Sequence, residues 1–81
     1  MKNTRIFKVE VRAEVNYGDG YTTINESGKF VAKNAREAID IAEAVLLDTA
    51  SFENDFGKMI TPKYRNIDTL NVLLLAESSV F

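Results

Sequence analysis

Residues 5–15 read Arg-Ile-Phe-Lys-Val-Glu-Val-Arg-Ala-Glu-Val. Every second residue from Phe7 to Val15 is apolar, and a period of two is typical of a strand that buries one face. The other face carries charges, which we expect to point into water. These charged residues are Lys8, Glu10, Arg12 and Glu14. The alternation therefore predicts a half-buried strand at the centre of the protein.

A glycine-rich loop follows this strand. Residues 16–21 read Asn-Tyr-Gly-Asp-Gly-Tyr, and glycine reaches positive φ at little cost. A phosphate-binding loop needs a helix directly after it, and a calcium loop needs more oxygen ligands at alternate positions. We therefore interpret residues 16–21 as the loop of a β-hairpin.

The returning strand covers residues 21–33. If Val15 lies opposite Thr22, the apolar residues of both strands share one face. Glu26 then points inward, which is unfavourable for a charged group. Either Glu26 is accommodated there, or residues 26–28 form a bulge or a second tight turn, since glycine inside a strand commonly marks such a break.

A helix is predicted to begin after Asn34, which suits the N-cap position, with Glu37 placed to reach back in a capping box. The following residues have the three-and-four spacing of one apolar helix face. They are Ala35, Ala38, Ile39, Ala42, Val45, Leu46 and Thr49. The pattern continues towards Phe52. The segment after it is irregular, and Met59 with Ile60 is expected to add a short edge strand.

Residues 70–76 read Leu-Asn-Val-Leu-Leu-Leu-Ala and predict a last strand that is apolar on both faces. Alternation places Leu73 and Leu75 on the face away from the core. A chain of 81 residues can enclose one core but not a second layer. We therefore expect a second chain to cover Leu73 and Leu75 in a homodimer through this C-terminal strand. Alternatively, residues 78–81 fold back, and Val80 and Phe81 cover them.

These elements predict an α+β fold in a single domain, residues 1–81. The order is strand, strand, helix and strand (β-β-α-β), giving a three- to four-stranded antiparallel sheet with one amphipathic helix packed on one face. A right-handed crossover places the last strand beside the first. The expected core consists of apolar residues from all four elements. They are Phe7, Val9, Val11, Ile24, Phe30, Ile39, Ala42, Val45, Leu46, Leu70, Val72 and Leu74, with Phe52 and Phe56 closing one end.

The composition is that of a folded protein, with 46% hydrophobic and 27% charged residues. The chain has no Cys and no His, which excludes disulfides and thiolate metal sites and removes the commonest zinc ligand. We identify no catalytic residue, no metal ligand and no cofactor site. The net charge of −2 and the scattered Lys and Arg residues disfavour nucleic acid as a partner.

No stretch of the sequence is apolar for long enough to cross a bilayer. Charges at every other position near the N-terminus are incompatible with a signal peptide. We therefore expect a cytoplasmic protein without membrane contact.

The remaining signals indicate binding surfaces. Besides Leu73 and Leu75, the polar side of the helix combines acidic residues with an apolar one, which suits a basic protein partner. These candidate interface residues are Asp40, Glu43, Leu47 and Asp48. The sequence thus predicts a non-enzymatic interaction module. In size and style it resembles small acidic helix-and-sheet accessory proteins of phages and mobile elements. That resemblance implies action by protein binding, for example inhibition of a host system.

The alternative is a small-ligand-binding or enzymatic domain whose site forms at a dimer interface. Its candidate polar residues, brought together from two chains, are Glu10, Arg12, Tyr64 and Arg65. A chain without His or Cys has few groups that titrate near neutral pH, and this favours the interaction module.

Overall fold

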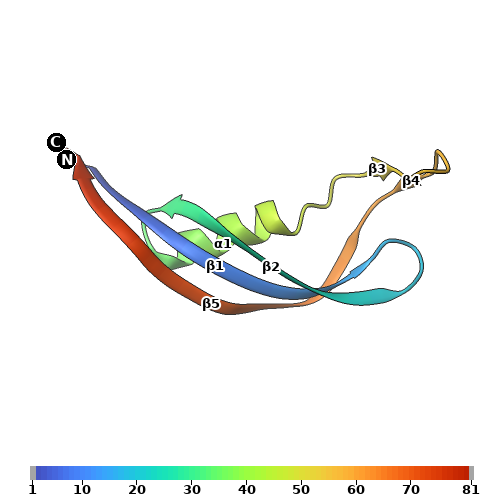
Figure 1. Cartoon of the computed structure of the whole chain (residues 1–81), viewed down its shortest axis with the longest axis horizontal. Coiled ribbons are helices and arrows are strands. Elements are labelled where there is room, and N and C mark those ends of the chain that lie inside the picture. Colours follow the sequence, from blue (N-terminus) through green and yellow to red (C-terminus); the bar gives the residue numbers. More distant parts are fainter. Residues whose placement is uncertain (1, 81) are drawn as a thin grey trace.

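A computed structural model describes residues 2–80 of the chain, and the side chains of residues 4–77. Within these residues the chain forms one long antiparallel sheet, one helix and a second small sheet (Figure 1). The main sheet has the strand order β2-β1-β5, and β3 pairs with β4. The predicted α+β class with an antiparallel sheet is confirmed. The elements are β1 (Lys2–Asn16), β2 (Tyr21–Ala32), α1 (Ala35–Leu46), β3 (Phe52–Glu53), β4 (Met59–Ile60) and β5 (Lys63–Val80).

The element order differs from the predicted one between α1 and β5. Met59 and Ile60 do form a strand, but Ile60 pairs with Phe52 of β3 and not with an edge of the main sheet. The turn between β3 and β4 is held by Asn54, whose Oδ1 accepts hydrogen bonds from the backbone N–H groups of Phe56 and Lys58, both at 2.9 Å. The described chain therefore has the order β-β-α-β-β-β.

The β1–β2 hairpin has the predicted register, with Val15 opposite Thr22, and the pairing continues without interruption to Ala32. The proposed bulge or second turn at residues 26–28 is therefore wrong. Gly28 has a packing role instead, because a Cβ there would lie 2.9 Å from Cζ of Phe30. The loop is organised by Asn16, whose Oδ1 accepts from the N–H groups of Gly18 at 2.6 Å and Gly20 at 3.3 Å. Both glycines have positive φ, 120° and 101°.

The start of α1 follows the predicted cap, and its end does not follow the predicted apolar pattern. The Asn34 Oδ1 accepts from the N–H of Glu37 at 2.9 Å. The Glu37 carboxylate reaches back to the N–H of Lys33 at 3.2 Å. The helix ends at Leu46, so the expected continuation towards Phe52 is wrong.

Two contacts hold the chain away from the helix axis just after α1. The Asp48 Oδ1 accepts from the N–H of Ala50 at 2.9 Å, a local turn that competes with helix. The Tyr64 hydroxyl of β5 donates to the backbone carbonyl of Asp48, also at 2.9 Å. Burial raises the pKa of Tyr64, so this phenol stays protonated and remains a donor through the neutral range.

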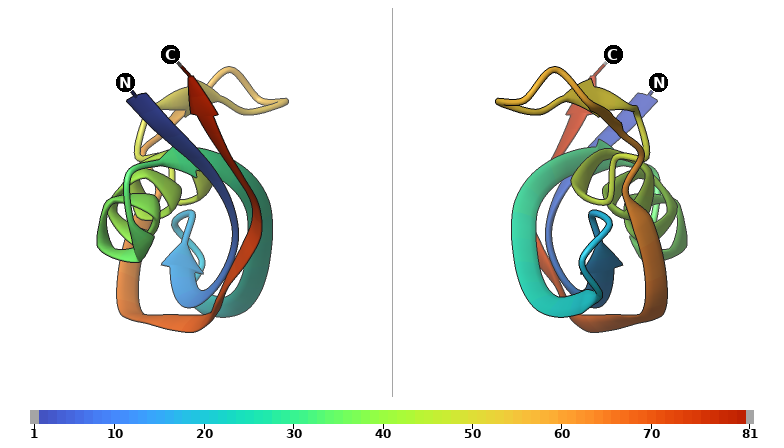
Figure 2. Two further views of the ribbon diagram at one scale, coloured as in Figure 1. Left: turned by 90° about the vertical axis from the view of Figure 1, so that its left-hand side faces the viewer. Right: turned by 90° about the vertical axis from the view of Figure 1, so that its right-hand side faces the viewer.

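The core lies between α1 and the sheet, mainly over β1 and β2 (Figures 1 and 2). It is built from alternate residues of β1 and two alanines of the helix. The buried residues of this cluster are Phe7, Val9, Val11, Ala13, Ala32, Ala38, Ala42 and Leu47. The alanines allow the helix backbone to lie close to the strands.

Several predicted core residues lie outside this core. Leu70 and Leu74 of β5 are exposed, because α1 contacts β5 least of the three strands, and Val45 of α1 is exposed as well. Phe52 and Phe56 are exposed as well, and they do not close an end of the core. The core predicted for the last strand is therefore wrong except for Val72, which packs against the buried cluster.

β5 is bulged at three places, where it contains one residue more than β1. It has 18 residues against the 15 of β1. Leu70 and Leu75 have no partner on β1, and Asn66 with Ile67 together lie opposite Ala13. Asn66 has a left-handed φ of 52°, which fits a bulge. Bulges increase strand twist, and the strands coil strongly around the long axis (Figure 2).

The molecule is long and thin, with extents of 52 × 23 × 15 Å. Its radius of gyration is 15.6 Å, whereas a compact domain of this length has about 12 Å. Among the described residues, no helix is long and apolar enough to cross a membrane.

Substitutions at two neighbouring residues of β1 test which face of the strand is buried. Val11 is fully buried, so Val11→Asp should unfold the protein, because an unpaired buried charge costs at least about 3 kcal/mol. Arg12→Ala removes an exposed ion pair to Asp68 and should change the free energy of unfolding by less than about 0.5 kcal/mol. The free energy of unfolding of both variants can be measured by urea denaturation. Equal destabilisation would show that the charged face of β1 is also an interface.

Candidate interaction surface

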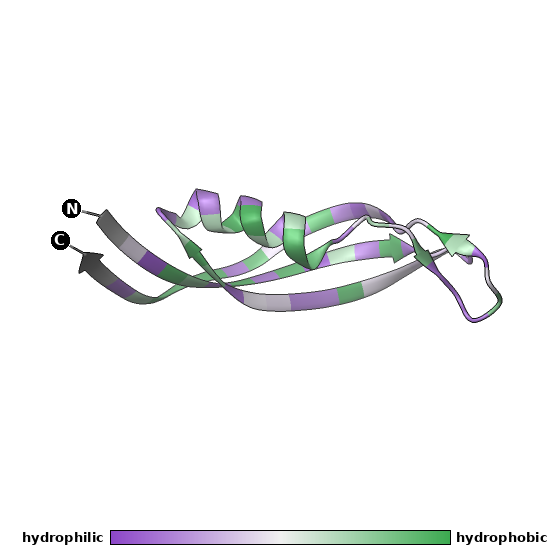
Figure 3. Cartoon of the chain, turned by 90° about the horizontal axis from the view of Figure 1, so that it is seen from above, coloured by the Kyte–Doolittle hydropathy of each residue, from purple (hydrophilic) through white to green (hydrophobic). Residues whose placement is uncertain are grey.

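Exposed apolar side chains concentrate on β5, which forms one edge of the sheet. We call four of them, all between 42% and 50% exposed, the β5 leucine cluster. They are Leu70, Leu73, Leu74 and Leu75. No charged residue interrupts β5 between Thr69 and Ala76. Hydrophobic and hydrophilic residues alternate along β1 (Figure 3), whereas this stretch of β5 carries no charge.

The β5 leucine cluster presents apolar side chains on both faces of the strand. Leu74 lies opposite Phe7, which points to the helix side of the sheet. Leu73 lies opposite Lys8, on the outer face. Leu70 and Leu75 are the unpaired residues of two bulges. Simple alternation predicted Leu75 on the same face as Leu73, but the bulge at Leu75 interrupts that alternation.

The outer face of the sheet extends this apolar surface. Ile6 of β1 lies between Val31 of β2 and Ala76 of β5, and the three form one row across the sheet. Val31 is 61% exposed. Leu73 lies in the adjoining row, beside Lys8. The outer face is therefore apolar at this end and charged towards the hairpin loop.

The chain after Glu77 does not fold back over the leucines. The backbone of residues 78–80 continues β5 and pairs with residues 2–4 of β1. Coverage of Leu73 and Leu75 by a returning tail is therefore wrong for residues 78–80. Phe81 lies outside the described residues.

The acidic side of α1 offers less free charge than predicted. Asp40 forms an exposed ion pair with Arg36 at 3.8 Å. The Asp48 carboxylate accepts from Ala50 in the turn after the helix. Glu43 is half-buried. Leu47 is only 5% exposed and belongs to the core, so its predicted place on this surface is wrong. The helix has ended at this residue, and its non-helical ψ of 60° changes the course of the chain.

Three of the four polar residues of the alternative ligand site, Arg12, Tyr64 and Arg65, have partners within the chain. Arg12 pairs with Asp68 at 3.9 Å, on the outer face. The Tyr64 side chain lies on the opposite face and bonds to the connection after α1. Glu10 lies beside Asn71, remote from Arg65 along the sheet. These groups do not form a site within one chain.

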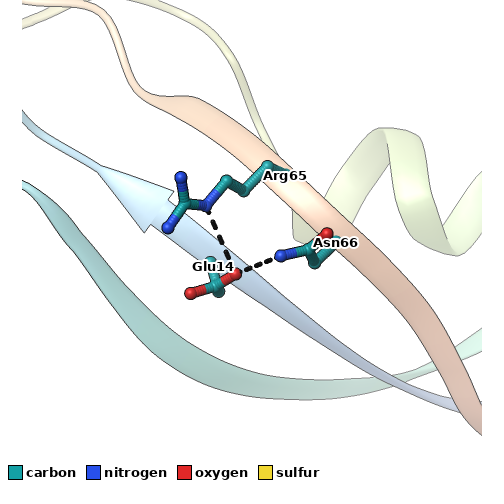
Figure 4. A network of polar contacts seen from close by, with 3 residues as sticks. All are labelled: Glu14, Arg65 and Asn66. Carbon is teal, nitrogen blue, oxygen red and sulfur yellow. Dashed lines mark hydrogen bonds and ion pairs between the residues drawn. The ribbon is translucent and has the colours of Figure 1, made fainter.

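A polar network fixes the third bulge of β5 on β1 (Figure 4). The Glu14 carboxylate accepts from the Nδ2 of Asn66 and from the Nε of Arg65, the latter at 3.3 Å. The Arg65 guanidinium also lies 3.6 Å above the ring of Tyr21 on β2. Arg65 thus links all three strands. The alternation of charges along β1 gave no signal for this network, which depends on the irregular geometry of β5.

A cavity of about 480 Å³ lies between the hairpin loop and the β3–β4 sheet. Asp19 of the loop and Lys58 and Lys63 beyond it are the charged residues of its lining. Within the described chain, no group of three or more His, Cys, Asp or Glu residues is placed to hold a metal ion. The cavity therefore offers scattered polar contacts, without a convergent set of reactive groups.

Comparisons with known protein families, curated proteins and solved structures found no match. The function is therefore argued from the exposed apolar surface and its geometry.

The Glu14 network should make stability depend on pH. Hydrogen bonds from Asn66, and then Arg65, lower the pKa of Glu14. The unfolded chain then binds the proton more readily, so the stabilisation is present above the ordinary carboxyl pKa and is lost as pH falls through the lowered value. Glu14→Gln should therefore lower the melting temperature at pH 7 more than at about pH 3. An equal difference at both pH values would contradict this role.

Proposed function

We propose that this protein is a non-enzymatic interaction module that binds another protein chain through β5. The observation that carries the proposal is the β5 leucine cluster, which exposes apolar side chains on both faces of an edge strand. An exposed apolar edge strand favours pairing with another chain. Contiguous apolar surface of this kind is typical of protein contacts.

The accessible surface of the chain supports a binding role. It measures 5773 Å², whereas a compact protein of 9.1 kDa has about 4,900 Å². The excess of roughly 900 Å² reflects the elongated shape, which leaves more surface open to a partner than a compact protein has. The extended shape therefore provides enough surface for a specific contact.

The polar groups support a role without catalysis. The pairs Arg12–Asp68, Arg36–Asp40 and Glu14–Arg65 are exposed ion pairs of the kind that is common on protein surfaces. A binding module acts by occupying a surface of its partner, as an accessory protein of a phage or mobile element does when it inhibits a host system. The exposed Asp40 and Asp48 would favour a basic partner on the helix side.

A double substitution tests this function. Leu73→Thr with Leu75→Thr retains strand propensity but removes apolar area. Both leucines are about half exposed, and covering the remainder is worth roughly 1.5–3 kcal/mol in total, so affinity should fall about 10- to 100-fold. Tagged protein co-expressed with an untagged copy should retain a stoichiometric binding partner, and the double variant should lose it.

Val45→Thr is the control, because Val45 is an apolar residue on the helix that is more exposed than either leucine. This variant should retain the same partner. Circular dichroism shows whether each variant is folded. If the unmodified chain retains neither a second copy nor another protein, the proposed function is wrong.

A further inference from the structure

We propose that the chain which covers the β5 leucine cluster is a second copy of this protein, paired antiparallel through β5 with Leu73 at the two-fold axis. This inference rests on the proposed function and names its partner. It follows from the different character of the two sheet edges, from the register of β5, and from the lack of charge between Thr69 and Ala76.

The two free edges of the main sheet differ. β2 carries exposed charges on both faces, Glu26 on the helix side and Lys29 on the outer side, and charged side chains along an edge strand protect it from pairing. β5 carries no charge from Thr69 to Ala76 and has leucines on both of its faces. An apolar surface that continues around both sides of a strand fits a partner at that edge. A partner stacked on the outer face alone would leave Leu74 uncovered.

The bulges of β5 limit where such pairing can occur. Leu70 and Leu75 interrupt the ladder, and the four residues between them are regularly paired with β1. Of these four, Val72 and Leu74 point to the helix side, while Asn71 and Leu73 point to the outer side. Pairing through this short regular stretch closes a dimer, because each copy uses the same edge and no second β5 remains free.

The register follows from which side chains would meet. In an antiparallel pair related by a two-fold axis, a residue on the axis meets its own copy. With Leu73 on the axis, leucine meets leucine on the outer face, and Val72 meets Leu74 on the helix side. An axis at Val72 would instead place the polar Asn71 opposite Leu73 on the outer face. The axis at Leu73 therefore pairs only apolar residues within Val72–Leu74.

The partner is a second copy because this stretch is complementary to itself. It carries no charge, so it requires no opposite charge on the partner, and its apolar residues are matched by their own symmetry mates. The charged residues that flank the stretch, Asp68 and Glu77, pair within their own chain with Arg12 and Arg5.

The absence of cysteine from the sequence allows a direct test of the register. Leu73→Cys introduces one thiol per chain, and directly opposite Cβ atoms in a sheet lie about 4.5–5.5 Å apart, close enough for a disulfide after a small adjustment. Mild oxidation should convert most of this variant into a covalent dimer. Val31→Cys is the control, since Val31 is exposed on the outer face at the other edge. It should remain uncrosslinked.

Sedimentation of three lysine variants distinguishes edge pairing through β5 from stacking of the outer faces. Leu73→Lys and Leu74→Lys lie on opposite faces of β5, and each should weaken the dimer by roughly 100-fold or more, because each buries a charge. Val31→Lys should leave the dimer intact. If Leu73→Lys and Val31→Lys both give monomers and Leu74→Lys does not, the outer faces stack and edge pairing is wrong.

A clean monomer of the unmodified protein at micromolar concentration would overturn the dimer. The proposed function would then still hold if a different protein is retained through Leu73 and Leu75, so the two failures are distinguishable. Should a lysine variant fail to fold, the oxidation of Leu73→Cys decides: a crosslink no stronger than that of Val31→Cys overturns the proposal.

Discussion

The length of the helix limits what this protein can bury. A helix of 12 residues is about 18 Å long, and the molecule extends over 52 Å. Its two buried alanines lie over the alternating residues of β1, where the core is complete. The strand farthest from the helix in the sheet, β5, receives little cover. The exposed leucines therefore result from an imbalance between one short helix and three long strands.

Strong coiling fits the same constraint. With one helix available, a flat sheet of this length would expose much of one side, whereas a coiled sheet brings its strands around the helix (Figure 2). The extra residues of β5 provide the longer path that a strand at the margin of such a coil must follow. Arg65, held between Glu14 and Tyr21, fixes this path near the hairpin loop.

The sequence predicted the regular parts of this architecture. Alternation identified the buried face of β1 and the register of β2, because that ladder contains no bulge and each residue's face follows from its position. On β5 it gave the correct faces of Val72, Leu73 and Leu74 and failed at the bulges, which exchange the two faces. Leu70 and Leu75 are ordinary strand residues with no glycine or proline to mark a bulge. The exposure of Leu74 was missed because it lies on the helix side, where α1 gives β5 little cover.

The central position of β1 has a consequence for the order in which the protein folds. β1 pairs with β2 through a short loop, but with β5 through residues from the other end of the chain. Closing a long loop costs more chain entropy than closing a hairpin, so we expect the hairpin to form first and β5 to join last. Until then, the backbone N–H and C=O groups on the β5 side of β1 have no hydrogen-bond partners. The strand that carries the binding surface is thus also the one that completes the sheet.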